Sequence, residues 1–193
     1  MTSGPVSRVS RRSSAETKAR IIEAAQVAFS SRGYAQSVLT EIGESADVTA
    51  PLIIRYFGSK EGLFEDAFSQ AIDALPVFAA DPADFGKLSI AMMTGGHEPT
   101  QRASGMIAHS IGDPRSREIV MRLIRERVIN PLAESMGSPD GALRAELMVM
   151  LGIGYTTMRM VLPVADAEAG EAPVLASWLT EAVQSLVDWP VAP

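Results

Sequence analysis

The chain has 193 residues, of which 47% are apolar and 21% charged, so it can bury a core in one large domain or in two smaller ones. It contains no cysteine, which excludes disulfide bridges, thiolate metal sites and thiol nucleophiles. The net charge is −6, but residues 1–65 hold eight Lys/Arg and seven Asp/Glu (+1), whereas residues 66–193 hold nine and sixteen (−7). The acidic part of the chain therefore follows a weakly basic N-terminal part. This distribution means that the negative net charge does not exclude a nucleic-acid partner.

The sequence offers no segment suited to a membrane or to export. The longest uncharged stretch, Leu147 to Met158, has 12 residues, which is too short to cross a bilayer. The N-terminus is basic but lacks the apolar core of a signal peptide. We therefore expect a cytoplasmic protein with no membrane partner.

The front end predicts an arm followed by a helix. Residues 1–13, rich in Ser, Arg and Gly, are expected to form a flexible basic arm. Ser13 and Glu16 have the spacing of a capping box for a helix over about 14–32. Gly33 can end that helix in the left-handed conformation.

Two short helices are predicted next. Ser37 is placed to cap a helix over about 38–45. Asp47 stands where a sharp turn would need a positive φ, which aspartate tolerates better than most residues. Thr49 is placed to cap a third helix, with Pro51 in its first turn, where a missing N–H costs little.

Proline and glycine signals divide the rest of the chain into further helices. They are expected at about 60–79, 82–94, 99–111, 114–136, 139–162 and 172–188. Pro131 should kink the helix over 114–136. No run of any length alternates with the period of a strand, so the predicted fold is all-α.

The second and third helices are about two turns each, and isolated helices of that length are marginal in water. They must therefore pack on the first helix, and the residues available for this are Phe29, Ile42, Val48, Ile53 and Phe57. Two short helices joined by a tight turn form a helix-turn-helix, whose second helix lies in the major groove of DNA. A short helix suits this role because it need only span the groove.

The same residues resemble the N-terminal signature of the tetracycline-repressor (TetR) family of transcriptional regulators. The matching positions lie within about 14–64 and are Ile21, Ile22, Ala24, Ala25, Phe29, Gly33, Tyr34, Ile42, Ala46, Asp47, Val48, Thr49, Phe57, Lys60 and Leu63. The resemblance implies a homodimer with a DNA-binding head over 14–62 and a helical domain over 63–193 that dimerises and holds a small-molecule effector. It implies DNA contacts at Ser37, Thr40, Thr49, Ala50, Pro51, Leu52, Ile54, Tyr56 and Lys60.

Three positions depart from the family pattern. Asp47 replaces the usual turn glycine, and Gly43 replaces a usual alanine, which weakens the second helix by roughly 1 kcal/mol on propensity. Ile54 replaces a common tyrosine, so a phenol is lost, although isoleucine can contact a thymine methyl group. Tyr56 offers a hydroxyl, but in a different direction on the helix.

The basic residues of the front end support the same interpretation. Lys60, at the start of a helix, adds charge where backbone N–H groups can face a phosphate. Arg55 can follow the DNA backbone, and Arg11 and Arg12 can contact phosphates or enter the minor groove. Taken singly, Arg55 and Lys60 are more typical of ordinary solvated charges, and Arg11 and Arg12 are equally consistent with an idle tail. Their common placement around a helix-turn-helix favours DNA binding.

The rear helices predict a dimer interface. Apolar stripes on 139–162 and 172–188 look wider than one core requires, so antiparallel pairs from two subunits would form a four-helix interface, the alternative being a plain monomer core. The expected interface residues are Leu147, Met150, Leu151, Gly154, Met158, Leu175, Trp178, Leu179, Ala182 and Leu186. A two-fold dimer would place its recognition helices about 34 Å apart, or somewhat more, on an inverted-repeat operator.

Methionine-rich helices predict a small-molecule pocket, because methionine adapts to varied ligands; the alternative is ordinary core. The candidate pocket residues are Phe78, Met92, Met106, His109, Met121, Arg122, Arg125, Met148 and Tyr155. The sequence does not identify the ligand.

The first alternative to a DNA-binding regulator is an enzyme. With two histidines and no cysteine, a zinc or thiol site is improbable, and we expect no metal or cofactor. Gly152 and Gly154 lie inside a predicted helix with no preceding strand, so they form no dinucleotide loop. The second rival is a helical ligand-binding or scaffold protein that has lost operator recognition, for which Ile54 is the best argument. We expect a dimeric regulator, a repressor released by an effector.

Overall fold

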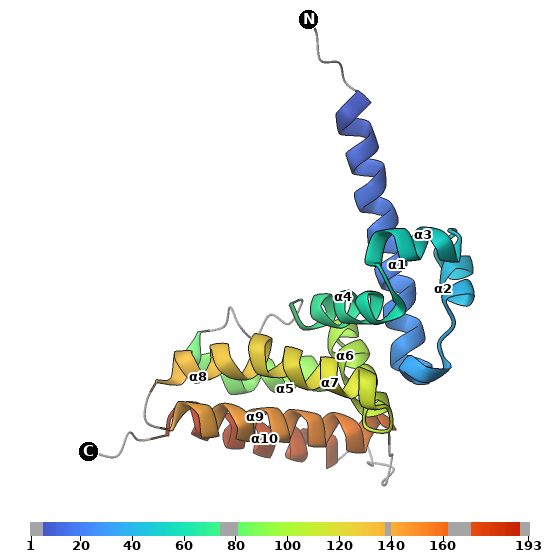
Figure 1. The fold of residues 1–193 in the computed structure, drawn as a ribbon. Coiled ribbons are helices and arrows are strands. Elements are labelled where there is room, and N and C mark those ends of the chain that lie inside the picture. Colours follow the sequence, from blue (N-terminus) through green and yellow to red (C-terminus); the bar gives the residue numbers. More distant parts are fainter. Residues whose placement is uncertain (1–5, 74–80, 138–139, 162–170, 190–193) are drawn as a thin grey trace, which may run out of the picture.

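The structure is a computed structural model and describes residues 6–73, 81–137, 140–161 and 171–189. Within these ranges every element is helical and no strand occurs, which confirms the all-α prediction (Figure 1). The helices are α1 (Val6–Gln36), α2 (Leu39–Ser45), α3 (Ala50–Phe57), α4 (Lys60–Asp73), α5 (Phe85–Thr94), α6 (Glu98–Ser110), α7 (Pro114–Ile124), α8 (Asn130–Met136), α9 (Gly141–Thr156) and α10 (Glu171–Val187). Three short segments accompany them: a 3₁₀ turn at Pro82–Asp84 and π-helical segments at Arg125–Ile129 and Thr157–Val161.

The first helix is longer than predicted. It begins at Val6, and its first turns project past α3 (Figure 1). Ser13 therefore lies inside the helix, where its carbonyl accepts a 2.8 Å hydrogen bond from the Thr17 hydroxyl, so the predicted capping box is wrong. No glycine or proline interrupts the sequence from Val6 to Arg32, which allows the helix to continue. Gly33 adopts a φ of 77°, as predicted.

The head is built on one apolar cluster. Phe29, Ile42 and Ile53 are buried in it, with Val48 and Phe57 packed against its edge, so the predicted packing of α2 and α3 on the first helix is confirmed. An aromatic group strengthens the cluster, since the Phe64 ring lies 5.1 Å from Phe29 and 5.5 Å from Tyr34, both edge-on. Burying each such ring contributes about 1.5–3 kcal/mol.

The head and the body are joined by continuous packing. The same cluster includes Met106 of α6 and Leu123 of α7. At the crossing of α1 and α6, a Cβ atom built on Gly105 would lie 2.5 Å from the Ser30 carbonyl oxygen, so the two backbones touch. The Gln26 amide donates to the Ala67 carbonyl (2.9 Å) and accepts from Arg102 (3.0 Å), which links α1, α4 and α6.

The rear of the body has a second core between α5, α9 and α10. Ile90, Met148 and Val183 are among its buried residues. Arg144 is buried beside it, and its guanidinium donates to the carbonyls of Leu186 (2.7 Å), Val187 (2.9 Å) and Met136 (3.3 Å). These bonds satisfy carbonyls at the C-terminal ends of α8 and α10 that would otherwise lack a partner.

Pro131 changes the hydrogen-bond pattern of the helix that contains it. Residues 125–129 form a π-helical segment, after which the Asn130 amide bonds to the Arg125 carbonyl, five residues back. Pro131 has no N–H to continue the ladder of hydrogen bonds, and a π-bulge is one of the ways in which a helix accommodates such a gap. The helix predicted over 114–136 is therefore α7, this segment and α8.

No helix in the described ranges is both long and apolar enough to span a membrane.

The Gly105 contact predicts a stability effect. Gly105→Val would force α1 and α6 apart, and overpacking of this kind typically costs about 1–3 kcal/mol. Gly112→Val is the matched control, because a Cβ atom there meets nothing within 4 Å. Urea unfolding should show the loss for Gly105→Val and a change within about 0.5 kcal/mol for Gly112→Val. Equal stability of both variants would contradict the close approach of the helices.

Candidate functional site: the head surface and the body cavity

The third helix presents one face outward. Ile53 points inward and is fully buried, whereas Pro51, Ile54 and Arg55 are exposed. These three residues stand at spacings of three and four, which places them on one side of a helix. Thr49, the N-cap residue, is exposed at the start of this side and its side chain makes no capping hydrogen bond. We call Thr49, Pro51, Ile54 and Arg55 the α3 outer face.

The turn between α2 and α3 depends on Gly43 and Asp47. The Val48 amide bonds to the Gly43 carbonyl (2.9 Å), and a Cβ atom on Gly43 would lie 2.7 Å from the Val48 carbonyl oxygen. Asp47 has a φ of 54°, as predicted. Gly43 is therefore the position where the turn folds back on α2, a role that helix propensity alone does not reveal.

Ser37 lies away from the head surface. Its side chain is 1% exposed, and its hydroxyl donates to the Gly33 carbonyl (2.7 Å). The N-cap of α2 is Val38, so the predictions of a cap and of a DNA contact at Ser37 are wrong. The reason is that the left-handed Gly33 leaves a carbonyl for Ser37 to satisfy. Thr40, by contrast, is exposed in the first turn of α2.

Tyr56 turns toward α1 rather than outward. It is half-buried, its hydroxyl is 3.3 Å from the Ser14 hydroxyl, and the Lys18 amine lies 5.6 Å from its ring centroid. Ala50 and Leu52 are also half-buried. Arg11 lies within α1, as does Arg12, but their side chains are outside the described part of the structure.

Lys60 stands at the junction of α3 and α4. Its amine is 4.4 Å from the Tyr34 ring centroid, a cation–π contact, and burial lowers its pKa. Burial, followed by a hydrogen bond to the Glu61 carboxylate, raises the pKa of Tyr34 to about 12. The hydrogen bond from Tyr34 lowers the pKa of Glu61. At neutral pH the Tyr34 phenol is therefore neutral and donates to the Glu61 carboxylate, with the Lys60 amine over its ring.

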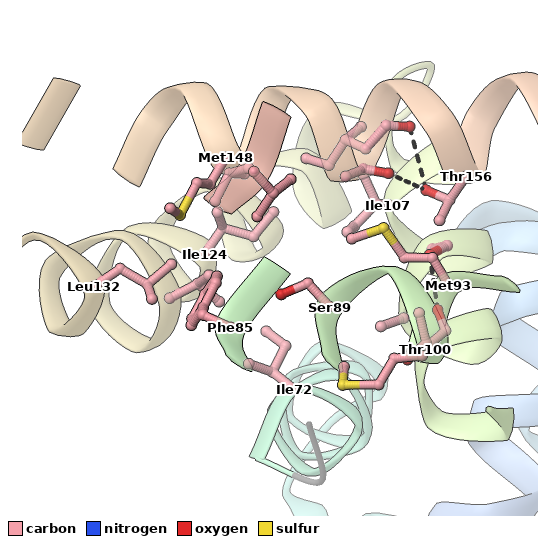
Figure 2. A pocket seen from close by; sticks show the side chains of 18 of the residues that line it. Ile72, Phe85, Ser89, Met93, Thr100, Ile107, Ile124, Leu132, Met148 and Thr156 are labelled. Atoms are coloured by element: carbon pink, nitrogen blue, oxygen red, sulfur yellow. Dashed lines mark hydrogen bonds between the residues drawn. The ribbon is translucent and has the colours of Figure 1, made fainter. Parts of the chain in front are cut away.

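A cavity of about 140 Å³ lies in the body between α4, α5, α6, α9 and the π-helical segment Arg125–Ile129 (Figure 2). Its walls are mainly apolar and carry four hydroxyl groups. The lining residues are Phe68, Ile72, Phe85, Ser89, Met92, Met93, Thr100, Ala103, Ser104, Ile107, Ile124, Val128, Leu132, Met148, Val149, Gly152, Ile153, Thr156 and Val183.

Of the residues predicted for a pocket, Met92 and Met148 line the cavity. Met106 is buried in the core between head and body, and Tyr155 packs against the rear core without reaching the cavity. Phe78 lies outside the described residues.

Three further pocket predictions are wrong because their side chains lie on the surface. Met121 and Arg125 are exposed, and Arg122 pairs outside with Glu65 at 2.8 Å. His109 does not reach the cavity but lines a separate, open hollow between α1 and α6. The sequence missed Phe68, Ile72 and Ile124 as lining residues, because an inward apolar residue has the same spacing whether it meets a core or a cavity.

The rear helices expose an apolar face, which we call the α9–α10 face. Met150 (64% exposed) and Trp178 (59%) stand out, with Leu143, Met158, Val174 and Leu175 also exposed. Gly154 is exposed with open space around it, and Leu147, Leu151 and Ala182 are half-buried. Leu179 and Leu186 are buried within the chain's own rear core, so their assignment to a dimer interface is wrong.

Two short helices pack on α1 through a buried core, a tight turn joins them, and the second presents the α3 outer face. This arrangement defines a helix-turn-helix DNA-binding protein. A family model described as "Bacterial regulatory proteins, tetR family" matches residues 21–67. One described as "Tetracyclin repressor-like, C-terminal domain" matches residues 86–187, more than half of the chain. The chain therefore belongs to the TetR family of DNA-binding transcriptional regulators.

Solved structures share the fold over nearly the whole chain. A TetR-family regulator from Rhodococcus sp. has a TM-score of 0.73 at 16% identity, covering 90% of this chain and 99% of its own. NalD, the secondary repressor of a multidrug efflux pump in Pseudomonas aeruginosa, has 0.66 at 16%, covering 92% and 100%. The multidrug-binding protein EbrR, solved with ethidium, has 0.64 at 21%, covering 91% and 99%. A search of curated proteins found no match.

The α3 outer face predicts the effect of Arg55. Arg55→Gln should weaken binding to all DNA sequences alike and lower the log–log salt slope by about 0.9, because one phosphate contact is lost. Arg125→Gln, an exposed arginine of the body, is the matched control and should leave both unchanged. Fluorescence anisotropy at several salt concentrations measures both quantities. An unchanged slope for Arg55→Gln would remove this residue from the interface.

Proposed function

We propose that this regulator is a homodimeric repressor that binds an inverted-repeat operator and is released when a small molecule enters the body cavity. The observation that carries the proposal is the course of α4. Its first half, with Leu63 and Phe64, belongs to the head core, and its second half, with Phe68 and Ile72, lines the cavity. One rigid helix thus contacts both the DNA-binding unit and the space for a ligand.

The mechanism follows from that geometry. A ligand that presses on Phe68 and Ile72 displaces α4, and α4 carries the head with it through Phe64. In a dimer this changes the distance between the two recognition helices, which must match successive turns of DNA. Linkage requires that operator DNA weaken ligand binding by the same factor by which ligand weakens DNA binding.

The α9–α10 face supports the dimer. Several large apolar side chains of α9 and α10 are exposed, as is typical of an interface. A two-fold axis through the face would bury Met150 and Trp178 against their copies. The structural neighbours NalD, a repressor, and EbrR, a multidrug-binding protein, support repression and ligand binding by analogy of fold. We place the protein in the cytoplasm, where its operator lies.

Selection of genomic DNA fragments tests operator recognition. The purified protein should enrich fragments that share an inverted repeat whose half-sites are centred about 10 base pairs or somewhat more apart. A shared palindrome would agree with the proposal, and Arg55→Gln should enrich the same palindrome more weakly, because a phosphate contact carries no sequence information. If no sequence is enriched, the protein is better explained as a helical ligand-binding protein that has lost operator recognition.

The α9–α10 face predicts the effect of a substitution at Trp178 on dimerisation. Trp178→Arg should convert the dimer to monomer, because it places charge in an apolar interface, and operator affinity should fall by at least about tenfold as one half-site is lost. Ile111→Arg is the matched control, an exposed apolar residue at the end of α6. Sedimentation equilibrium and operator titration measure the two effects. A dimer that survives Trp178→Arg with full affinity would contradict this interface.

A further inference from the structure

Three of the four hydroxyl groups in the cavity wall are already satisfied. The Thr156 hydroxyl donates to the Gly152 carbonyl (2.9 Å), and the Ser104 hydroxyl donates to the Thr100 carbonyl (2.7 Å). The Thr100 hydroxyl lies 2.9 Å from Nδ1 of His97. These three hydroxyl groups therefore do not require a hydrogen bond from a ligand.

Ser89 is different. It is 5% exposed, and its hydroxyl is, within the described part of the chain, the one buried side-chain polar atom that has no hydrogen-bond partner. Figure 2 shows this hydroxyl pointing in among the lining side chains, away from Thr100 and Thr156. A serine in a helix usually bonds a carbonyl one turn back, so a buried hydroxyl without a partner calls for an explanation.

The cavity wall also lacks charge. None of its described lining residues is Asp, Glu, Lys, Arg or His. The nearby ion pair between Arg127 and Asp73 (3.2 Å) joins side chains that are about half exposed, outside the cavity. An ion brought into such a site would lose its hydration without finding an opposite charge, which is strongly unfavourable. The cavity therefore excludes cations and anions.

We propose that the cavity selects an uncharged, compact and mainly apolar molecule of about one aromatic ring that forms a single hydrogen bond with the Ser89 hydroxyl. The volume of about 140 Å³ sets the size, since an apolar protein cavity of about 150 Å³ accepts benzene. Met92, Met93 and Met148 let the wall adjust to the shape of the ring. This inference rests on the proposed function, because it names the chemical class of the effector.

Calorimetry on the purified, DNA-free protein tests the class with four probes that each carry one phenyl ring. Phenol has a hydroxyl where toluene has a methyl group, and benzoate and benzylammonium add a charge of either sign. Phenol should bind about five-fold more tightly than toluene, the value of one neutral hydrogen bond. Neither ion should bind measurably. Equal affinity for phenol and toluene, tighter binding of either ion, or no binding of any probe would overturn the proposal.

Ser89→Ala isolates the hydrogen bond. This variant should bind toluene with unchanged affinity but phenol less tightly than toluene, because the phenol hydroxyl is then buried without a partner. Its ligand-free form should melt at a higher temperature, because the buried Ser89 hydroxyl without a partner is removed. Ser104→Ala is the matched control in the same wall, where the hydroxyl is already bonded. It should keep the preference for phenol. A preference that persists in Ser89→Ala would overturn the assignment of Ser89.

An operator titration separates this inference from the proposed function. If phenol binds with the expected preference but saturating phenol leaves the operator complex intact, the ligand class stands and release by an effector fails. If the operator is bound but no probe enters the cavity, the ligand class fails and DNA binding stands.

Discussion

The packing of Phe64 against Phe29 and Tyr34 is the contact on which the molecule depends. It fixes the start of α4 to α1, and through the same cluster it sets the angle at which α2 and α3 stand on the head. One turn further along α4, Phe68 stacks at 6.3 Å on Phe64 and faces the cavity. The stacked rings of Phe64 and Phe68 therefore help to set both the outward direction of α3 and the shape of the cavity.

The front end could be predicted from sequence in some detail because its signals are local. The glycine at 33, the positive φ at Asp47 and the N-cap position of Thr49 all follow from backbone preferences of single residues. The failures at Ser13 and Ser37 have a common cause. A serine caps a helix only if the helix begins there, and in this chain α1 starts earlier and α2 starts later.

The body could be predicted only as a set of helices. Met92 and Met106 have the same chemistry and both lie on the inner side of a helix, yet one lines the cavity and the other fills a core. The difference arises because α5 packs mainly on α10, whereas α6 packs on α1 and α4, and no local pattern in the sequence records these partners. Arg122, assigned to the pocket for its charge, lies outside because Glu65 of α4 offers it a partner.

Arg144 gives the body a mechanical asymmetry. Its buried guanidinium donates hydrogen bonds to carbonyls of α8 and α10, and a hydrogen bond of a charged group contributes about 1.5–3 kcal/mol. On the opposite side, α4 is held to the neighbouring helices partly by half-exposed ion pairs, such as Glu65 with Arg122, worth about 0–1 kcal/mol each. The buried residues Phe64 and Phe68 hold α4 in the same core as the head. In the proposed mechanism, a ligand that widens the cavity would therefore move α4 and the head together as one body, away from a wall that Arg144 holds in place.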